Sequence, residues 1–260
     1  MGQTLVIAEK PSVAGDIARA LGGFKKDGDF WVSDAMIVGS AVGHLLEIKA
    51  PEEYDVKRGR WSFANLPVLP PHFDLQPIKK SIKKFEGLEK KIRSRSVTDI
   101  INACDAGREG ELIFRYIIQA TGTKKPIRRL WLQSMTKTSI QKAFTALRSD
   151  AEMKPLEAAA RSRSEADWLV GINGTRALTA FNSKDGGFFL TTVGRVQTPT
   201  LAIVVAREEE IAHFKPQNYW EVHATFGAQA GDYDSVWVDA DFKKTKGQSA
   251  ELKPERLWTA

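Results

Sequence analysis

Acidic residues follow two apolar segments that are typical of β-strands. Glu9 comes directly after Thr4–Ala8, and Asp105 comes directly after Val97–Cys104, with Glu109 four residues further on. If the two strands lie side by side and parallel, these acids meet at their carboxyl ends, where ligands of open α/β sheets bind. Clustered carboxylates repel one another unless a cation neutralises them, and hard oxygen ligands suit Mg²⁺ in sites that handle phosphate groups. The spacing therefore predicts a Mg²⁺ site.

The same acids also have a structural interpretation. Asp105 stands where a helix N-cap belongs, and Glu109 falls in a first helical turn, where negative charge stabilises the helix. Lys10 and Arg108 flank the carboxylates and can hold phosphate oxygens, Arg108 by a bidentate contact. Plain salt bridges to the same acids fit the sequence equally well, so metal binding and capping both stay open on spacing alone.

Composition and charge limit the class of protein. The 260 residues suggest about two domains, and a net charge of +6, from 38 basic and 32 acidic residues, favours a polyanionic partner. The single cysteine excludes an internal disulfide and fits a reducing, cytoplasmic compartment. No charged-then-apolar leader precedes Thr4, and no apolar run reaches membrane-spanning length, so we expect no membrane partner.

Three regions differ in their patterning. Strand and helix patterns alternate through residues 1–153, which predicts an α/β fold with a parallel sheet flanked by helices. Residues 154–215 are mainly helical. Within residues 216–260, the alternation at Tyr219–Ala224 and at Ser235–Ala240 predicts two strands that open a β-rich region.

One face of the first long helix carries side chains suited to nucleic acid. Arg161, Trp168, Ile172 and Arg176 are seven, four and four residues apart, which places them within an arc of roughly 80°. Arginine for phosphates and tryptophan for base stacking suit a single-stranded track. An amphipathic helix that buries Trp168 explains the same spacing. The lysine-rich helix near residues 79–93 is more typical of a solvated face, adding only nonspecific attraction to nucleic acid.

Several stretches resemble known families. Glu9 after the first strand and Asp105 after a later one resemble the TOPRIM domain, a metal-binding fold of type IA and type II topoisomerases, bacterial primases and some nucleases. The second Asp of its Asp-x-Asp pattern is Gly107 here, which weakens a two-ion site, and Glu109 can partly compensate. Further matches resemble type IA DNA topoisomerases, specifically the bacterial topoisomerase III branch: Ala8–Ser12, Val42–Glu47, Gly107–Glu111, Glu165–Asn173 and Val193–Pro199.

The resemblance implies an activity and further site residues. Such enzymes need Mg²⁺ but no ATP; they cleave one strand of single-stranded DNA, pass another strand through the break and reseal it. It implies that Glu9, Lys10 and Arg108 serve catalysis, Glu9 as general acid to the leaving 3′ hydroxyl, and that Glu9, Asp105 and Glu109 hold the metal in a monomer. The implied DNA-binding residues are Arg60, Trp61, Arg161, Trp168, Arg176, Thr192, Val193, Gly194, Arg195, Val196 and Gln197.

Two of these residues have simpler explanations. Trp61 is equally expected to pin a long irregular segment to the sheet, and Gly194 is otherwise an ordinary turn residue. A role in DNA binding for either one therefore comes from the resemblance and not from the pattern itself.

The family's nucleophile is a tyrosine in a Tyr-x-Arg setting. None of the tyrosines stands in that setting: Tyr54, Tyr116, Tyr219 and Tyr233. The resemblance therefore implies an amino-terminal portion, with a TOPRIM domain, a helical DNA-binding segment and the start of a gate domain, which binds DNA and metal without cleaving. A TOPRIM nuclease or primase, which needs no tyrosine, and a non-catalytic DNA-binding module are the alternatives.

Overall fold

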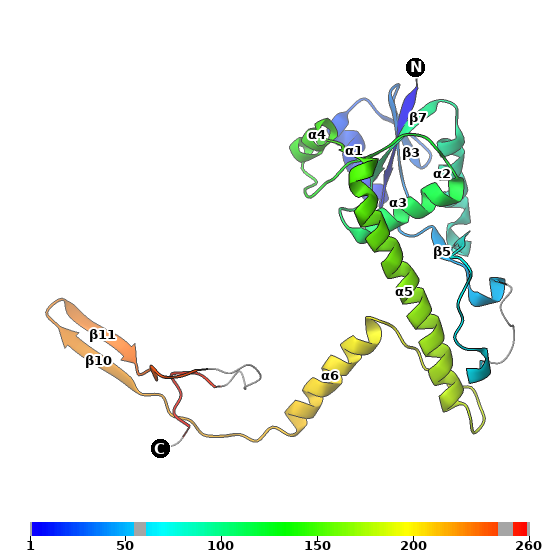
Figure 1. Ribbon diagram of the computed structural model, residues 1–260. Coiled ribbons are helices and arrows are strands. Elements are labelled where there is room, and N and C mark those ends of the chain that lie inside the picture. Colours follow the sequence, from blue (N-terminus) through cyan, green and yellow to red (C-terminus); the bar gives the residue numbers. More distant parts are fainter. Residues whose placement is uncertain (1, 55–60, 244–251, 259–260) are drawn as a thin grey trace. The chain divides into compact units, whose positions relative to one another are not determined.

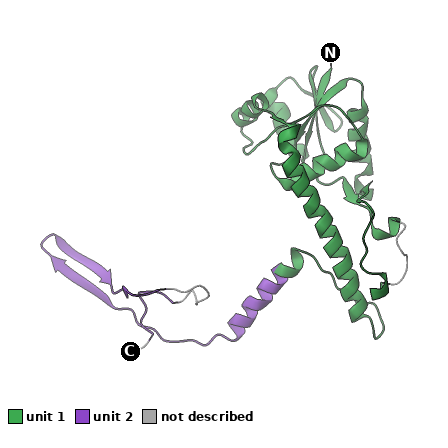
Figure 2. Ribbon diagram, in the orientation of Figure 1, with its two compact units in different colours: residues 1–199 green, residues 200–260 purple. Residues whose placement is uncertain are grey.

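The computed structural model describes residues 2–54, 61–243 and 252–258. The chain divides into two compact units, Met1–Pro199 and Thr200–Ala260 (Figure 2). The first unit contains a sheet flanked by helices, as the alternating pattern predicts, and each unit is described separately below. None of the helices in these described ranges is long and apolar enough to cross a membrane.

A seven-stranded mixed sheet forms the centre of the first unit (Figure 1). Its four middle strands, β4, β1, β7 and β8, pair in parallel, and antiparallel strands complete both edges. The predicted pairing of the first strand with the Val97 strand is confirmed, with Ala8 opposite Ala103. In spatial order the strands are β2 (Lys25–Asp27), β3 (Phe30–Val32), β4 (Met36–Ser40), β1 (Gln3–Ala8), β7 (Val97–Ala103), β8 (Ile127–Arg129) and β9 (Arg148–Ser149).

Helices cover both faces of this sheet, which is why its central strands are continuously apolar. Leu5 and Ile7 of β1 face a core formed with α2 (Ile82–Arg93) and α3 (Arg108–Thr121). Val6 and Ala8 point the other way, into a core shared with α1 (Pro11–Leu21) and α4 (Lys137–Thr145). This alternation fixes the register of β1, because a slip of one residue would exchange the two cores.

The described part of the segment between β4 and α2 is largely irregular. It contains the small antiparallel pair β5 (Leu46–Ile48) and β6 (Leu75–Pro77). The described residues of this segment also form three 3₁₀ turns: η1 (Pro51–Glu53), η2 (Phe63–Asn65) and η3 (Lys79–Ser81).

A long helix, α5 (Asp150–Asn182), follows the sheet. Ser149 caps it by accepting from the Glu152 amide, while the Glu152 carboxylate accepts from the Ser149 amide, a reciprocal capping box. The helix α6 (Gln197–Ala212) begins within the first unit and continues into the second.

The second unit contains an antiparallel hairpin, β10 (His223–Ala228) and β11 (Gly231–Val236). The predicted strands at Tyr219–Ala224 and Ser235–Ala240 are therefore misplaced. The tight turn between Ala228 and Gly231, with Gly231 at a φ of 126°, requires the paired strands to flank it directly.

Candidate metal and phosphate site

The carboxyl ends of β1 and β7 bring Glu9 and Asp105 together, as the parallel pairing predicts. Lys10 lies between them, with its ammonium Nζ 3.1 Å from Asp105 Oδ2 and 3.8 Å from Glu9 Oε1. The hydrogen bond from Lys10 to Asp105 and the charge of both acids raise the pKa of Lys10. One positive charge thus already lies within reach of both carboxylates.

The second oxygen of Glu9 is unusually placed. Glu9 Oε2 is buried without a hydrogen-bond partner among the described residues, and the Glu9 side chain is only 14% exposed. A buried carboxylate oxygen with no donor is costly, because it has lost its hydration and gained nothing in return. A metal ion bound to this oxygen would compensate for that loss.

Glu109 lies apart from this pair. It stands in the first turn of α3, 64% exposed, with Oε2 3.4 Å from His44 Nε2. Over the described ranges, no three His, Cys, Asp or Glu side chains approach closely enough to hold a metal ion, so the three predicted ligands do not form one cluster. Two carboxylates nevertheless fit Mg²⁺, which commonly binds one or two of them and completes its shell with water and phosphate oxygens.

The turn after β7 is held by two features. A Cβ on Gly110 would lie 2.2 Å from the carbonyl oxygen of Asp105, so only glycine lets α3 approach this turn. Gly107 is different: its extended φ of 167° suits any residue, and a Cβ there would meet nothing within 4 Å. The structure therefore has room for an aspartate at the position where the TOPRIM pattern has its second acid.

Arg129 of β8 is the second feature, and the sequence reasoning missed it. Its guanidinium donates to the carbonyl oxygens of Cys104 at 2.6 Å and Asp105 at 2.7 Å, and Nε lies 3.4 Å from Glu111 Oε2. The side chain is 1% exposed, and burial lowers the pKa of Arg129 while the charge of Glu111 opposes that shift. Arg129 shares the three-residue strand β8 with Ile127 and Arg128, and the sequence of this strand does not distinguish the two arginines.

Glu111 connects Arg129 to a buried network. It is fully buried and pairs with Arg115 at 2.7 Å, four residues further along α3. Asn102 donates to its other oxygen at 3.0 Å. Cys104 is 2% exposed, and burial raises the pKa of its thiol.

Arg108 does not pair with the acids. It lines a cavity of about 400 Å³ together with Arg163, Asp167, Arg195 and Val196. The Arg195 guanidinium contacts Asp167 Oδ1 at 2.7 Å and is 43% exposed in its side chain. The cavity thus brings the predicted phosphate-binding residue of α3 next to the predicted DNA-binding loop.

That loop, residues 192–197, is anchored on α5. The Val193 amide donates to Thr175 Oγ1 at 3.0 Å, and Gln197 Nε2 donates to Thr192 Oγ1 at 3.1 Å. The Gly194 amide donates to Thr198 Oγ1 at 3.1 Å, while Val196 is 61% exposed. The backbone of the loop is therefore fixed, while the side chains of Arg195 and Val196 remain accessible.

On α5, the predicted stacking residue Trp168 makes structural contacts. Its Nε1 donates to the Lys49 carbonyl oxygen at 3.1 Å, and its ring packs edge-on against Tyr54 and Phe73 at 6.4 and 5.8 Å between centroids. These contacts match the amphipathic alternative for Trp168. The Trp168 ring therefore packs α5 against the irregular segment between β4 and α2.

The arginines of the same helix also have protein partners. Arg161 pairs with Glu157 at 3.4 Å. Arg176 is 8% exposed, pairs with Glu52 and lies 5.2 Å from the centre of the Trp61 ring. Arg60 lies outside the described residues.

Comparison with known proteins connects these features to one family. Family models match the chain as a Toprim domain over residues 4–135 and as a DNA topoisomerase over residues 151–256. DNA topoisomerase 3 of Bacillus cereus (strain ATCC 14579) is 44% identical over 258 residues, covering 99% of this chain and 34% of the relative. That of Bacillus subtilis (strain 168) is 41% identical over 247 residues, covering 95% and 33%.

The chain spans about a third of the length of the curated relatives it matches. A full-length topoisomerase I from Thermotoga maritima shares the fold, with a TM-score of 0.55 and 22% identity over 95% of this chain and 36% of that one. Since the Toprim model matches just over half of the chain and the topoisomerase model matches most of the rest, this chain belongs to the Toprim-containing type IA DNA topoisomerases.

Proposed function

We propose that this chain supplies the metal- and phosphate-handling part of a Mg²⁺-dependent, ATP-independent topoisomerase that acts on single-stranded DNA. The observation that supports it best is the pair Glu9 and Asp105, which share one cation, the Lys10 ammonium, at the end of two parallel strands. A site that already stabilises a positive charge between two acids is suited to a divalent ion and a phosphate beside it.

Each residue of the pair has a distinct role in this proposal. Glu9 and Asp105 would hold Mg²⁺, and the ion would neutralise charge on the phosphate undergoing transfer. Glu9 would also serve as the general acid to the leaving 3′ hydroxyl. Lys10, exposed on its other side, would contact a phosphate oxygen.

The proposed path of the DNA leaves this site along α3 toward the loop at residues 192–197. Arg108 and Arg195 line one cavity and would each contact a backbone phosphate. We assign the segments 1–153, 154–215 and 216–260 to the Toprim domain, the helical DNA-binding segment and the opening of the gate domain. The protein would act as a cytoplasmic monomer, which the single buried cysteine fits.

The strand-breaking nucleophile is absent from these roles because none of the four tyrosines stands in a Tyr-x-Arg setting. Tyr54 and Tyr116 are also buried, at 7% and 5% exposure, and Tyr116 donates its hydroxyl to Ser164. We therefore propose that this polypeptide by itself binds DNA and metal without cleaving.

Incubation of the chain with an end-labelled single-stranded oligonucleotide and Mg²⁺ tests the proposal. Binding without cleavage is the expected result. Protein-linked DNA would reveal a nucleophile among the four tyrosines, and free cut ends would indicate a Toprim nuclease. Failure to bind the oligonucleotide would contradict the proposal itself.

A further inference from the structure

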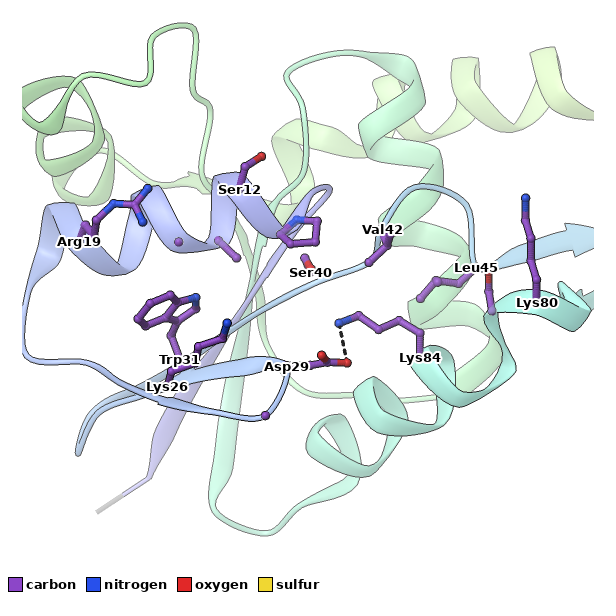
Figure 3. Close-up of a pocket in the computed structure, with 15 residues that line it drawn as sticks. Ser12, Arg19, Lys26, Asp29, Trp31, Ser40, Val42, Leu45, Lys80 and Lys84 are labelled. Atoms are coloured by element: carbon purple, nitrogen blue, oxygen red, sulfur yellow. Dashed lines mark hydrogen bonds and ion pairs between the residues drawn. The ribbon is translucent and has the colours of Figure 1, made fainter.

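A cationic pocket lies beside the first half of α1. It has a volume of about 400 Å³ and is bounded by the start of α1, the β2–β3 hairpin, the end of β4 and the start of α2 (Figure 3). Four cationic side chains line it, Arg19, Lys26, Lys80 and Lys84, against one carboxylate, Asp29. The roles argued above use none of these residues.

Two of the four cations are not neutralised. Lys84 is 3.1 Å from Asp29 Oδ2, and Arg19 pairs with Asp16. Lys26 and Lys80, in contrast, form no ion pair with any carboxylate in the described residues. Unpaired ammonium groups around a concave surface raise its positive potential and attract an anion.

The positions of these two lysines favour an extended ligand. Figure 3 shows Lys26 beside Trp31 at one end of the pocket and Lys80 beside Leu45 at the other. Lys26 Nζ lies 5.8 Å from the centre of the Trp31 ring, and that ring is only half-buried. An aromatic ring next to separated cations is the combination by which proteins hold unpaired nucleotides.

The pocket also adjoins the carboxylate site. Ser12 lines it and lies two residues after Lys10, while Val42 lines it and lies two residues before His44, the partner of Glu109. A strand held at Glu9 and Asp105 therefore has this pocket as its neighbour on the α1 side.

We propose that this pocket binds nucleotide units through their phosphates, with Lys26 and Lys80 as the contacts and Trp31 facing a base. The inference rests on the proposed function, because it extends the nucleic-acid path beyond the acidic site. It also gives part of the lysine-rich α2 region a specific role: Lys80 and Lys84 line the pocket, whereas Lys79 and Lys83, which are exposed like Lys80, do not line it.

This difference provides a matched pair of variants. Lys26→Gln/Lys80→Gln removes the two unpaired pocket charges, and Lys79→Gln/Lys83→Gln removes two exposed charges nearby, so both variants have the same net charge. The probes are an oligothymidine of about twelve nucleotides, within the span of single-strand sites, and thymidine 5′-monophosphate. Binding is measured between about 50 and 200 mM salt.

We expect the pocket variant to bind the oligothymidine about tenfold more weakly than wild type. The slope of log affinity against log salt should fall by about 1.4, from two lost contacts at about 0.7 each for single strands, while the control pair changes both values much less. If the pocket variant loses affinity only for the oligothymidine, the ligand of the pocket is a nucleic-acid strand. If it also loses affinity for the monophosphate, the pocket accepts free nucleotides as well.

Equal effects of the two variants, or no effect of either, would overturn the pocket assignment while leaving the proposed function intact, provided wild type binds the oligothymidine. If wild type binds neither probe, both the pocket and the proposed function are wrong.

Discussion

Replacing Arg129 with alanine tests whether one buried guanidinium holds the metal-site turn in place. The side chain is 1% exposed and donates to the carbonyl oxygens of Cys104 and Asp105 while facing Glu111. The variant would leave those carbonyl oxygens without their donor and would remove one of the two cations that face Glu111.

The expected cost follows from these contacts. Breaking a buried ion pair by removing one partner typically costs about 3–5 kcal/mol. Glu111 keeps Arg115 at 2.7 Å and Asn102 at 3.0 Å, so its charge stays partly compensated and the lower end of that range applies. We therefore expect Arg129→Ala to lower the free energy of unfolding by about 3 kcal/mol.

Amide hydrogen exchange in β1 and β7 is the suitable assay, because it reports on the first unit without requiring the whole chain to unfold in one step. Arg128→Ala is the matched control: it removes the neighbouring arginine, which is 49% exposed and pairs with Asp99 at 2.6 Å. Such a pair contributes at most about 1 kcal/mol. If the two variants destabilise β7 equally, the structural role assigned to Arg129 is wrong.

Two further predictions concern ligands. Arg195→Ala should weaken binding of single-stranded oligonucleotide and lower its salt slope by about 0.7, one phosphate contact; identical salt titrations for wild type and variant would remove the loop from the DNA path. Gly107→Asp should raise Mg²⁺ affinity, because φ is extended and a Cβ meets nothing within 4 Å. Gly107→Asn, which lacks the charge, is its control, and equal calorimetric affinities for both would contradict the placement of the ion.

The convergence of Glu9 and Asp105 was predictable because it depends on local signals and one topological rule. Each acid ends an apolar run short enough to be a buried strand, and parallel strands bring their carboxyl ends to one edge. The register, with Ala8 opposite Ala103, then places both acids where one ammonium reaches them.

Contacts between distant segments were not predictable in the same way. Arg176 finds Glu52 and Trp61, and Trp168 finds Tyr54, across more than one hundred residues of sequence. A helical face of arginine and tryptophan looks the same whether it meets DNA or another part of the chain. The difference depends on where an irregular segment folds back, and no periodic pattern encodes that position.

The burial of a charged side chain, Arg129, was also not predictable from the sequence. An arginine in a short strand such as β8 is usually at an edge and solvated, so the sequence favours that interpretation for both Arg128 and Arg129. Only Arg128 fits it, at 49% exposure against 1% for Arg129. The buried charge of Arg129 is tolerated because the fully buried carboxylate of Glu111 lies 3.4 Å from its Nε.

Calorimetric titration of Mg²⁺ into wild type and Asp105→Asn tests the central claim most directly, with Asp99→Asn, an acid in β7 away from the site, as control. We expect Asp105→Asn to weaken Mg²⁺ binding by about tenfold or more, since a charged oxygen ligand is lost. The control should bind like wild type, and the affinity of all three for single-stranded DNA should stay nearly unchanged. Mg²⁺ binding that is the same in wild type and Asp105→Asn would show that the pair Glu9 and Asp105 is not a metal site.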